Sequence, residues 1–107
     1  MSQNTTAGRL LELLLAESQA IRDAVVFAAG LMPERADAAM IGGLRLSLSE
    51  QLRLAEAAIV TAPKFRRQAF RLRGQVLAAR SFEASELVER HVEPPSQRWE
   101  SSAPMRR

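Results

Sequence analysis

Apolar residues recur every three or four positions along most of this chain, which is the spacing of amphipathic helices. The first such segment follows the potential N-cap residues Thr5 and Thr6 and stops before Gly30, which is followed by Pro33. The pattern predicts one long helix over residues 6–29. Its buried stripe is predicted to contain Leu10, Leu14, Ile21, Ala24 and Ala28.

A second apolar stripe predicts a helix that starts at Pro33 and ends near Thr61, with a possible kink at the Gly42-Gly43 pair. Two alternatives remain open for this segment. The alternation over residues 44–48 is also typical of a strand, and the helix can instead start at Ser47, whose hydroxyl and Glu50 form a capping-box pattern. The predicted stripe comprises Ile41, Leu44, Leu48, Leu52, Ala55 and Ile59.

Ala62 and Pro63 interrupt the periodicity and predict a tight turn into a third, antiparallel helix. After Arg80 the apolar phase shifts, which indicates a bend or a short fourth helix capped by Ser81. The stripe predicted for the third helix is Phe65, Ala69, Leu72, Val76 and Ala79.

The last segment, residues 93–107, is rich in Pro and Ser and nearly free of apolar residues, so we expect a disordered tail. Its Trp99 is the only Trp in the chain, and we expect it either to anchor the tail on a partner or to remain in solvent. The predicted fold is therefore all-α: an antiparallel bundle of three long helices plus a short fourth helix in residues 1–92, and a flexible tail in residues 93–107.

Composition narrows the possible functions. A chain of 107 residues fits one small domain, and 47% apolar with 25% charged residues is typical of globular proteins. The absence of Cys and the single His exclude a disulfide framework, thiolate catalysis, zinc fingers and any metal site with two imidazoles. No glycine-rich phosphate loop and no specific Ser, His and Asp set is present. We therefore predict a protein that is not an enzyme and has neither cofactor nor metal.

The apolar run over residues 10–16 contains Glu12 and is followed within two turns by Glu17, Arg22 and Asp23, which neither a signal peptide nor a membrane span tolerates. We expect a cytoplasmic protein that does not interact with membranes. Glu17 lies between Leu14 and Ile21 on the apolar stripe. We expect it either to form a buried ion pair with an Arg of the third helix or to reach solvent at the helix edge.

Positive charge is concentrated in one segment. Residues 1–62 carry a net charge of −2 and residues 63–107 a net charge of +5. We expect this basic cluster to pair mainly with acidic residues of the chain or of another subunit, and binding of a nucleic acid is the less favoured interpretation. The cluster comprises Lys64, Arg66, Arg67, Arg71, Arg73 and Arg80.

Apolar residues are more numerous than single-sided burial of the helices can accommodate. The third helix carries Phe70 and Leu77 away from its main stripe, and the second carries Leu46 and Leu54 off its own stripe. An uncovered apolar surface is typical of an interface, so we expect a homo-oligomer that also has a protein partner. The predicted interface residues are Phe65, Phe70, Leu72, Leu77, Leu46 and Leu54.

The sequence thus predicts a non-enzymatic helical protein-interaction module that self-associates, such as an adaptor, a chaperone-like protein or a regulator. The alternative is a nucleic-acid-binding regulator that uses the basic third helix.

Overall fold

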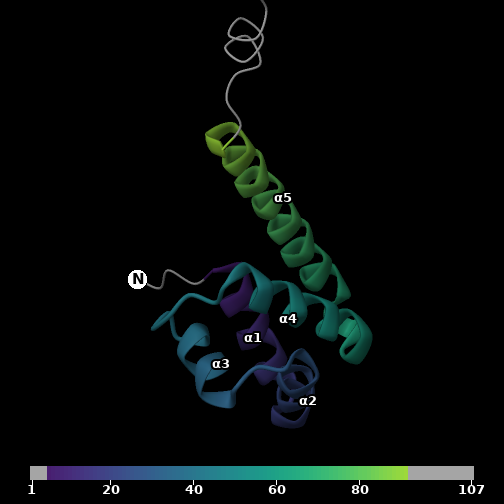
Figure 1. The fold of residues 1–107 in the computed structure, drawn as a ribbon. Coiled ribbons are helices and arrows are strands. Elements are labelled where there is room, and N and C mark those ends of the chain that lie inside the picture. Colours follow the sequence, from purple (N-terminus) through teal and green to yellow (C-terminus); the bar gives the residue numbers. More distant parts are fainter. Residues whose placement is uncertain (1–4, 92–107) are drawn as a thin grey trace, which may run out of the picture.

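The computed structural model describes residues 5–91, which form an all-helical fold (Figure 1). The predicted helical class is confirmed, but the predicted set of three long helices is wrong, because two of them are divided. The predicted tail, residues 93–107 with Trp99, lies outside the described residues. The helices are α1 (Thr6–Glu17), α2 (Gln19–Ala29), α3 (Pro33–Met40), α4 (Leu48–Thr61) and α5 (Arg66–His91), with a 3-10 turn, η1 (Pro63–Phe65), before α5.

The predicted first helix is divided at Ser18. This residue has extended backbone angles, with φ −171° and ψ 132°, and its N–H closes α1 by donating to the carbonyl of Leu14 at 3.0 Å. Its hydroxyl accepts hydrogen bonds from the N–H groups of Ala20 at 3.1 Å and Ile21 at 3.4 Å, at the start of α2. The Ser18 hydroxyl therefore accepts from N–H groups that have lost their intrahelical acceptors, which lowers the free-energy cost of interrupting the helix.

The break at Ser18 changes which face of α2 is buried. The predicted residues Leu10 and Leu14 are fully buried in α1, but the predicted Ala24 and Ala28 are exposed in α2. The prediction was wrong there because it continued the phase of α1 through a residue that is not helical. The residues of α2 that are buried are Arg22, Val25, Val26 and Ala29.

The predicted second helix is also divided, so the preferred continuous helix is wrong. Its first part, α3, ends before Gly42, which has φ +83°, a left-handed conformation that glycine adopts without steric cost. Its second part, α4, begins with the capping box: the Ser47 hydroxyl accepts from the Glu50 N–H at 3.1 Å, and a Glu50 carboxylate oxygen accepts from the Ser47 N–H at 2.8 Å. The alternative start at Ser47 is thus confirmed, and residues 44–47 form a loop, not a strand.

The turn at Ala62 and Pro63 reverses the chain, so that α5 packs along α4, as predicted. The predicted α5 stripe is confirmed at Phe65, Ala69, Leu72 and Val76, which are all buried. Ala79 is only half-buried. It marks the last turn of α5 that packs on the other helices.

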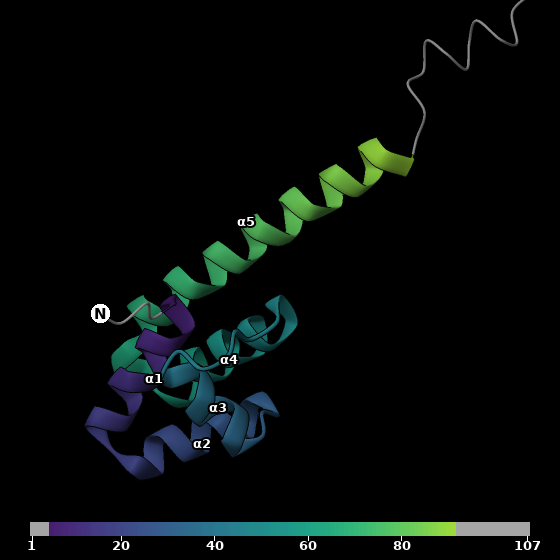
Figure 2. The same ribbon diagram turned by 90° about the vertical axis from the view of Figure 1, so that its left-hand side faces the viewer.

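No separate fourth helix follows Arg80, because α5 continues without a break to His91. That expectation is corrected: the shift of apolar phase marks the point where α5 leaves the other helices. We call residues 80–91 the overhang and helices α1 to α4 the body. Both ribbon views show the overhang projecting from the body with no other helix beside it (Figures 1 and 2). Residues 80–84 are all exposed.

The core lies where α1 is surrounded by the other helices. Helix α1 contacts α2, α3 and the beginning of α5, while α4 packs between α2 and α5. Leu10, Leu11 and Leu14 of α1 meet Leu54 of α4 and Leu72 of α5 in one cluster of buried side chains. In residues 5–91, no helix is both long enough and apolar enough to cross a membrane.

The two serine caps predict matched effects on stability. We expect Ser18→Ala and Ser47→Ala each to lower the free energy of unfolding by about 1 kcal/mol, because each removes the acceptor that satisfies a helix N-terminus. Chemical denaturation followed by circular dichroism measures the change. Ser49→Ala is the control, because Ser49 is exposed in α4 and forms no side-chain hydrogen bond within the described residues. Equal effects at all three positions would contradict the role of the caps.

Candidate interaction surface

One face of α5 carries apolar and small residues that no other helix of the described chain covers. Phe70, Gly74, Leu77, Ser81 and Ala84 fall within about 80° on a wheel of 100° per residue, roughly 130° from the centre of the buried stripe. We call these five residues the outward face. Phe70 is 49% exposed and Leu77 41% exposed, and a methyl group added at Gly74 would meet no atom within 4 Å. The outward face is therefore open from the body into the overhang.

The structure separates the predicted interface residues into two groups. Phe70 and Leu77 lie on the outward face, as an interface requires. The other four lie in the core of the chain itself, where they cannot contact a partner without unfolding, so their assignment to an interface is wrong. These four are Phe65, Leu72, Leu46 and Leu54. Leu46 precedes α4 and was assigned to a helix that does not exist there, which explains why its direction was misjudged.

The basic cluster is only partly paired with carboxylates. Lys64 lies 2.7 Å from Glu17, and Arg73 lies 3.7 Å from Glu56 of α4. Among the described residues, no carboxylate lies within 4 Å of the other four members, so internal pairing accounts for a minority of the cluster. These four are Arg66, Arg67, Arg71 and Arg80. The N-terminal half of α5 therefore presents uncompensated positive charge.

Glu17 forms an ion pair, but not the predicted one. Its partner is Lys64 in η1, not an Arg of the third helix. The pair is not buried, since the side chain of Glu17 is 35% exposed and that of Lys64 is 68% exposed. Glu17 is the last residue of α1, so the helix end keeps it near solvent. An exposed pair of this kind contributes little to stability.

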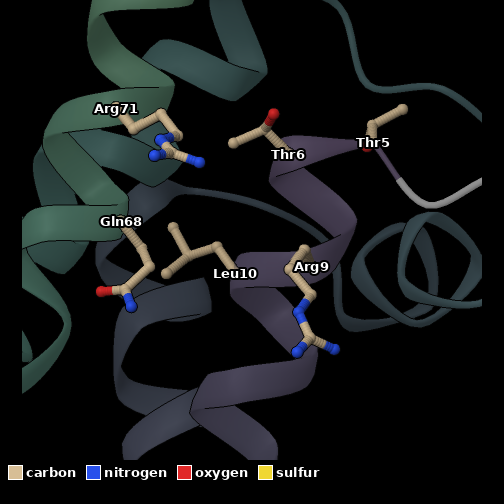
Figure 3. Close-up of a pocket in the computed structure, with 6 residues that line it drawn as sticks. All are labelled: Thr5, Thr6, Arg9, Leu10, Gln68 and Arg71. Atoms are coloured by element: carbon tan, nitrogen blue, oxygen red, sulfur yellow. The ribbon is translucent and has the colours of Figure 1, made fainter.

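A shallow pocket of about 260 Å³ lies between the N-terminal turn of α1 and α5 (Figure 3). Arg71 extends across from α5 toward Thr6, and Gln68 lies one turn earlier on the same helix (Figure 3). Arg9 also lines the pocket, but its guanidinium lies 3.3 Å from Glu12 on its own helix. The pocket is polar and cationic, and it is open to solvent beside the start of the outward face.

Sequence reasoning missed Arg22, the one charged residue that is buried among those whose burial the structure describes. Arg22 of α2 is 5% exposed and donates hydrogen bonds to Asp37 of α3 and to Asp23. Burial lowers the pKa of Arg22, but the hydrogen bonds to these two carboxylates outweigh burial and leave the pKa raised. Its Nε has no hydrogen-bond partner within the described residues. In the sequence, the signal for this ion pair is the carboxylate of Asp37, fifteen positions after Arg22. The break at Ser18, however, is what turns Arg22 toward the core.

A second hollow, of about 450 Å³, lies between α2 and α3. Its rim includes Phe27, which is 86% exposed, beside the buried Val26 and Leu31. Arg22 also lines this hollow, and its charge is already paired with Asp23 and Asp37. This hollow is more apolar than the pocket beside α5, but no continuous face extends from it.

A bidentate ion pair joins α3 to α4. Arg35 donates to both carboxylate oxygens of Glu50, at 2.7 Å each, while Glu50 also completes the capping box. The hydrogen bond from Arg35, followed by the one from the Ser47 N–H, lowers the pKa of Glu50 to about 2. Glu50 thus holds the start of α4 against α3, which determines where α4 begins and how far it can accompany α5.

No group of three or more His, Cys, Asp or Glu side chains that could hold a metal ion occurs in the part of the chain that the structure describes. In the three comparisons with known proteins, no family model, no curated protein and no solved structure matches the chain.

The Glu50 pair predicts a pH-dependent contribution to stability. Because the folded-state pKa is about 2 and the ordinary value is 4.5, the contribution is present above pH 4.5 and is lost as pH falls toward 2. We expect Glu50→Gln to lower the free energy of unfolding by about 1 kcal/mol at pH 7, with a smaller difference from the unmodified chain at pH 3.

Urea denaturation at both pH values measures this difference. Glu56→Gln is the matched control, because Glu56 is 54% exposed and its distance to Arg73 is 3.7 Å. A Glu50→Gln effect that is the same at pH 7 and pH 3 would contradict the assignment.

Proposed function

We propose that this protein is a non-enzymatic protein-interaction module in which α5 is the binding element and the body is its support. The observation that carries the proposal is the length of α5 relative to its packing. Its buried stripe ends at Val76, with Ala79 half-buried, but the helix continues to His91. The overhang is therefore a helix of about three turns whose residues 80–84 are exposed among the described helices.

A helix segment of this kind is marginal by itself. Isolated helices shorter than about 12–15 residues are barely stable in water, because most helical stability in proteins comes from packing an apolar face. In α5 such a face is present and uncovered, at Phe70 and Leu77. Phe82, in the overhang, is 64% exposed. A partner that covers α5 would supply the missing packing.

The other surfaces support an interaction function less well. The hollow between α2 and α3 is bounded by short helices and offers one large exposed side chain, Phe27. The pocket beside α1 has only about 260 Å³ and is lined mainly by polar side chains. Neither provides the length of helix that α5 presents.

Photo-crosslinking at matched phenylalanines tests the proposal. A photoreactive phenylalanine is placed at Phe70 or Phe82 of α5, or at Phe27 of α2 as the control, and irradiated in the native cells. Because all three side chains are exposed, each variant is expected to fold. We expect crosslinks to protein from the two α5 positions and not from Phe27. Crosslinks from Phe27 alone, or from none of the three, would contradict the assignment of α5.

A second candidate function, binding of nucleic acid, is favoured by one observation. Four arginines of the basic cluster have no carboxylate partner within the described residues, and Arg71 also lines a cationic pocket beside α1. Arginine is well suited to phosphate recognition through paired hydrogen bonds. Recognition of bases is less well supported, because the pocket lining is polar and the chain has few aromatic residues that could stack on bases.

Salt dependence distinguishes the two functions. Phosphate neutralisation makes log affinity for duplex DNA fall linearly with log salt, by about 0.9 per phosphate contact. Fluorescence anisotropy with a labelled duplex at two salt concentrations measures this slope. Because we propose a protein partner, we expect no submicromolar binding at physiological salt. Tight binding that weakens steeply with salt and is lost in the Arg66→Ala/Arg71→Ala variant would support nucleic-acid binding instead.

A further inference from the structure

We infer that the partner of the outward face is a second copy of the same chain, whose α5 lies antiparallel to the first. This inference rests on the proposed function and names the occupant and its orientation. It is carried by two features of α5: the order of large and small residues along the outward face, and the uneven distribution of charge along the helix.

Large and small residues alternate along the outward face. Phe70 and Leu77 are large, whereas Gly74, between them, and Ser81, after them, are small. In an antiparallel pair, Phe70 lies against the partner's Ser81 and Leu77 against the partner's Gly74, so each large side chain enters a space left by a small one. The same register brings Arg66 to the level of the partner's Ala84, on the same flank of the outward face. The outward face is therefore complementary to itself in this orientation.

A parallel pair would not have this complementarity. It would place Phe70 against Phe70 and Leu77 against Leu77, while Gly74 and Ser81 would each face their own copy across a gap. Unfilled space in an interface loses dispersion contacts and is destabilising. The open space around Gly74, where an added Cβ meets nothing within 4 Å, gives a partner side chain room to enter.

Charge favours the same orientation. The N-terminal turns of α5 carry Arg66, Arg67, Arg71 and Arg73 without an acid, and the first acid of the helix is Glu83 in the overhang. A parallel pair would place the two arginine-rich ends side by side. An antiparallel pair places the two arginine-rich ends at opposite ends of the contact, beside the partner's overhang, whose exposed residues 80–84 contain one base and one acid. Like charges in close contact are unfavourable, so this difference selects the orientation.

One kind of like-charge contact remains in the antiparallel pair, between Arg73 and the partner's Arg80. It occurs twice by symmetry and distinguishes the antiparallel pair from the parallel one. Arg73 and Arg80 lie on the same flank of the outward face, seven residues apart, so Arg80 of one copy lies beside Arg73 of the other. Arg73 is partly compensated by Glu56 of its own chain at 3.7 Å. Arg80 has no carboxylate within 4 Å among the described residues. In the parallel pair, Arg80 does not approach Arg73 of the other copy.

Disulfide crosslinking tests the orientation, because the natural chain contains no Cys. Arg66→Cys and Ala84→Cys each replace an exposed residue and leave the two large side chains intact. In the antiparallel pair these two positions face each other on one flank, whereas the two copies of either position lie at least ~25 Å apart along the axis. Disulfides need Cα atoms within about 7 Å.

We expect a disulfide-linked dimer when the two variants are mixed under mild oxidation, and none from either variant alone. Linked dimers from each variant alone, without an excess in the mixture, would overturn the antiparallel orientation. A chain that forms no disulfide in any of the three samples would overturn self-pairing through α5.

Sedimentation measurements test the contact itself. We expect the unmodified chain to form dimers at tens of micromolar, with about twice the 11.8 kDa of one chain. Leu77→Glu should raise the dimer dissociation constant by at least ~30-fold, because it places a charge in the centre of the contact. Val60→Glu in α4 is the matched control, since Val60 is 80% exposed and lies off the outward face. Circular dichroism confirms that both variants fold.

Arg80→Glu should strengthen the dimer, whereas Leu77→Glu should weaken it. Arg80→Glu replaces two like-charge contacts with Arg73 by two opposite-charge contacts, and we expect the dimer dissociation constant to fall by ~3-fold to ~10-fold. No change or a weaker dimer would overturn the antiparallel register. A monomer at all concentrations overturns the second copy as partner. If photo-crosslinks from Phe70 and Phe82 then lead to a different protein, the proposed interaction function still stands.

Discussion

The mismatch in length between α4 and α5 is the constraint on which the exposed surface of this protein depends. The two helices form a hairpin through the turn at Pro63, but α4 has 14 residues and α5 has 26. At 1.5 Å per residue, α5 is ~18 Å longer than its partner. Within residues 5–91 the excess packs against no other helix, so the overhang and the uncovered outward face follow directly from the point at which α4 begins.

That point is determined by a few local interactions. Gly42 takes a left-handed conformation after α3, and the Ser47–Glu50 capping box starts α4. Arg35 then holds Glu50 through two hydrogen bonds of 2.7 Å. If residues 33–61 had formed one continuous helix, as the apolar periodicity predicted, it would have been long enough to accompany the whole of α5. The capping interactions therefore convert a closed bundle into a body with a projecting helix.

The body is suited to hold α5 in a fixed direction. Leu72 of α5 belongs to the same buried cluster as the leucines of α1, and both α1 and α4 pack against α5. The outward face thus starts on a rigid part of α5, at Phe70, and extends into the part that lacks support. A contact made there would fix the orientation of two bodies while completing the packing of α5, which is the physical basis of the interaction function that we propose.

Much of the fold and part of the candidate surface could be predicted from the sequence. Local periodicity identified helices, the stop at Gly30, the turn at Pro63 and the buried stripe of α5, because these features depend on spacing and on backbone chemistry at single residues. The excess of apolar residues on α5 also identified Phe70 and Leu77, which are exposed as predicted.

Only the tertiary structure decided where long apolar stretches divide. A cap contributes about 1 kcal/mol, as much as the competing preference of a few residues for the helix, so the break at Ser18 depends on what each half packs against. That break turned Arg22 inward, and the loop before α4 turned Leu46 into the core. The reason is the same in both cases: periodicity reports which residues share a face while a helix continues, but the tertiary contacts determine whether it continues.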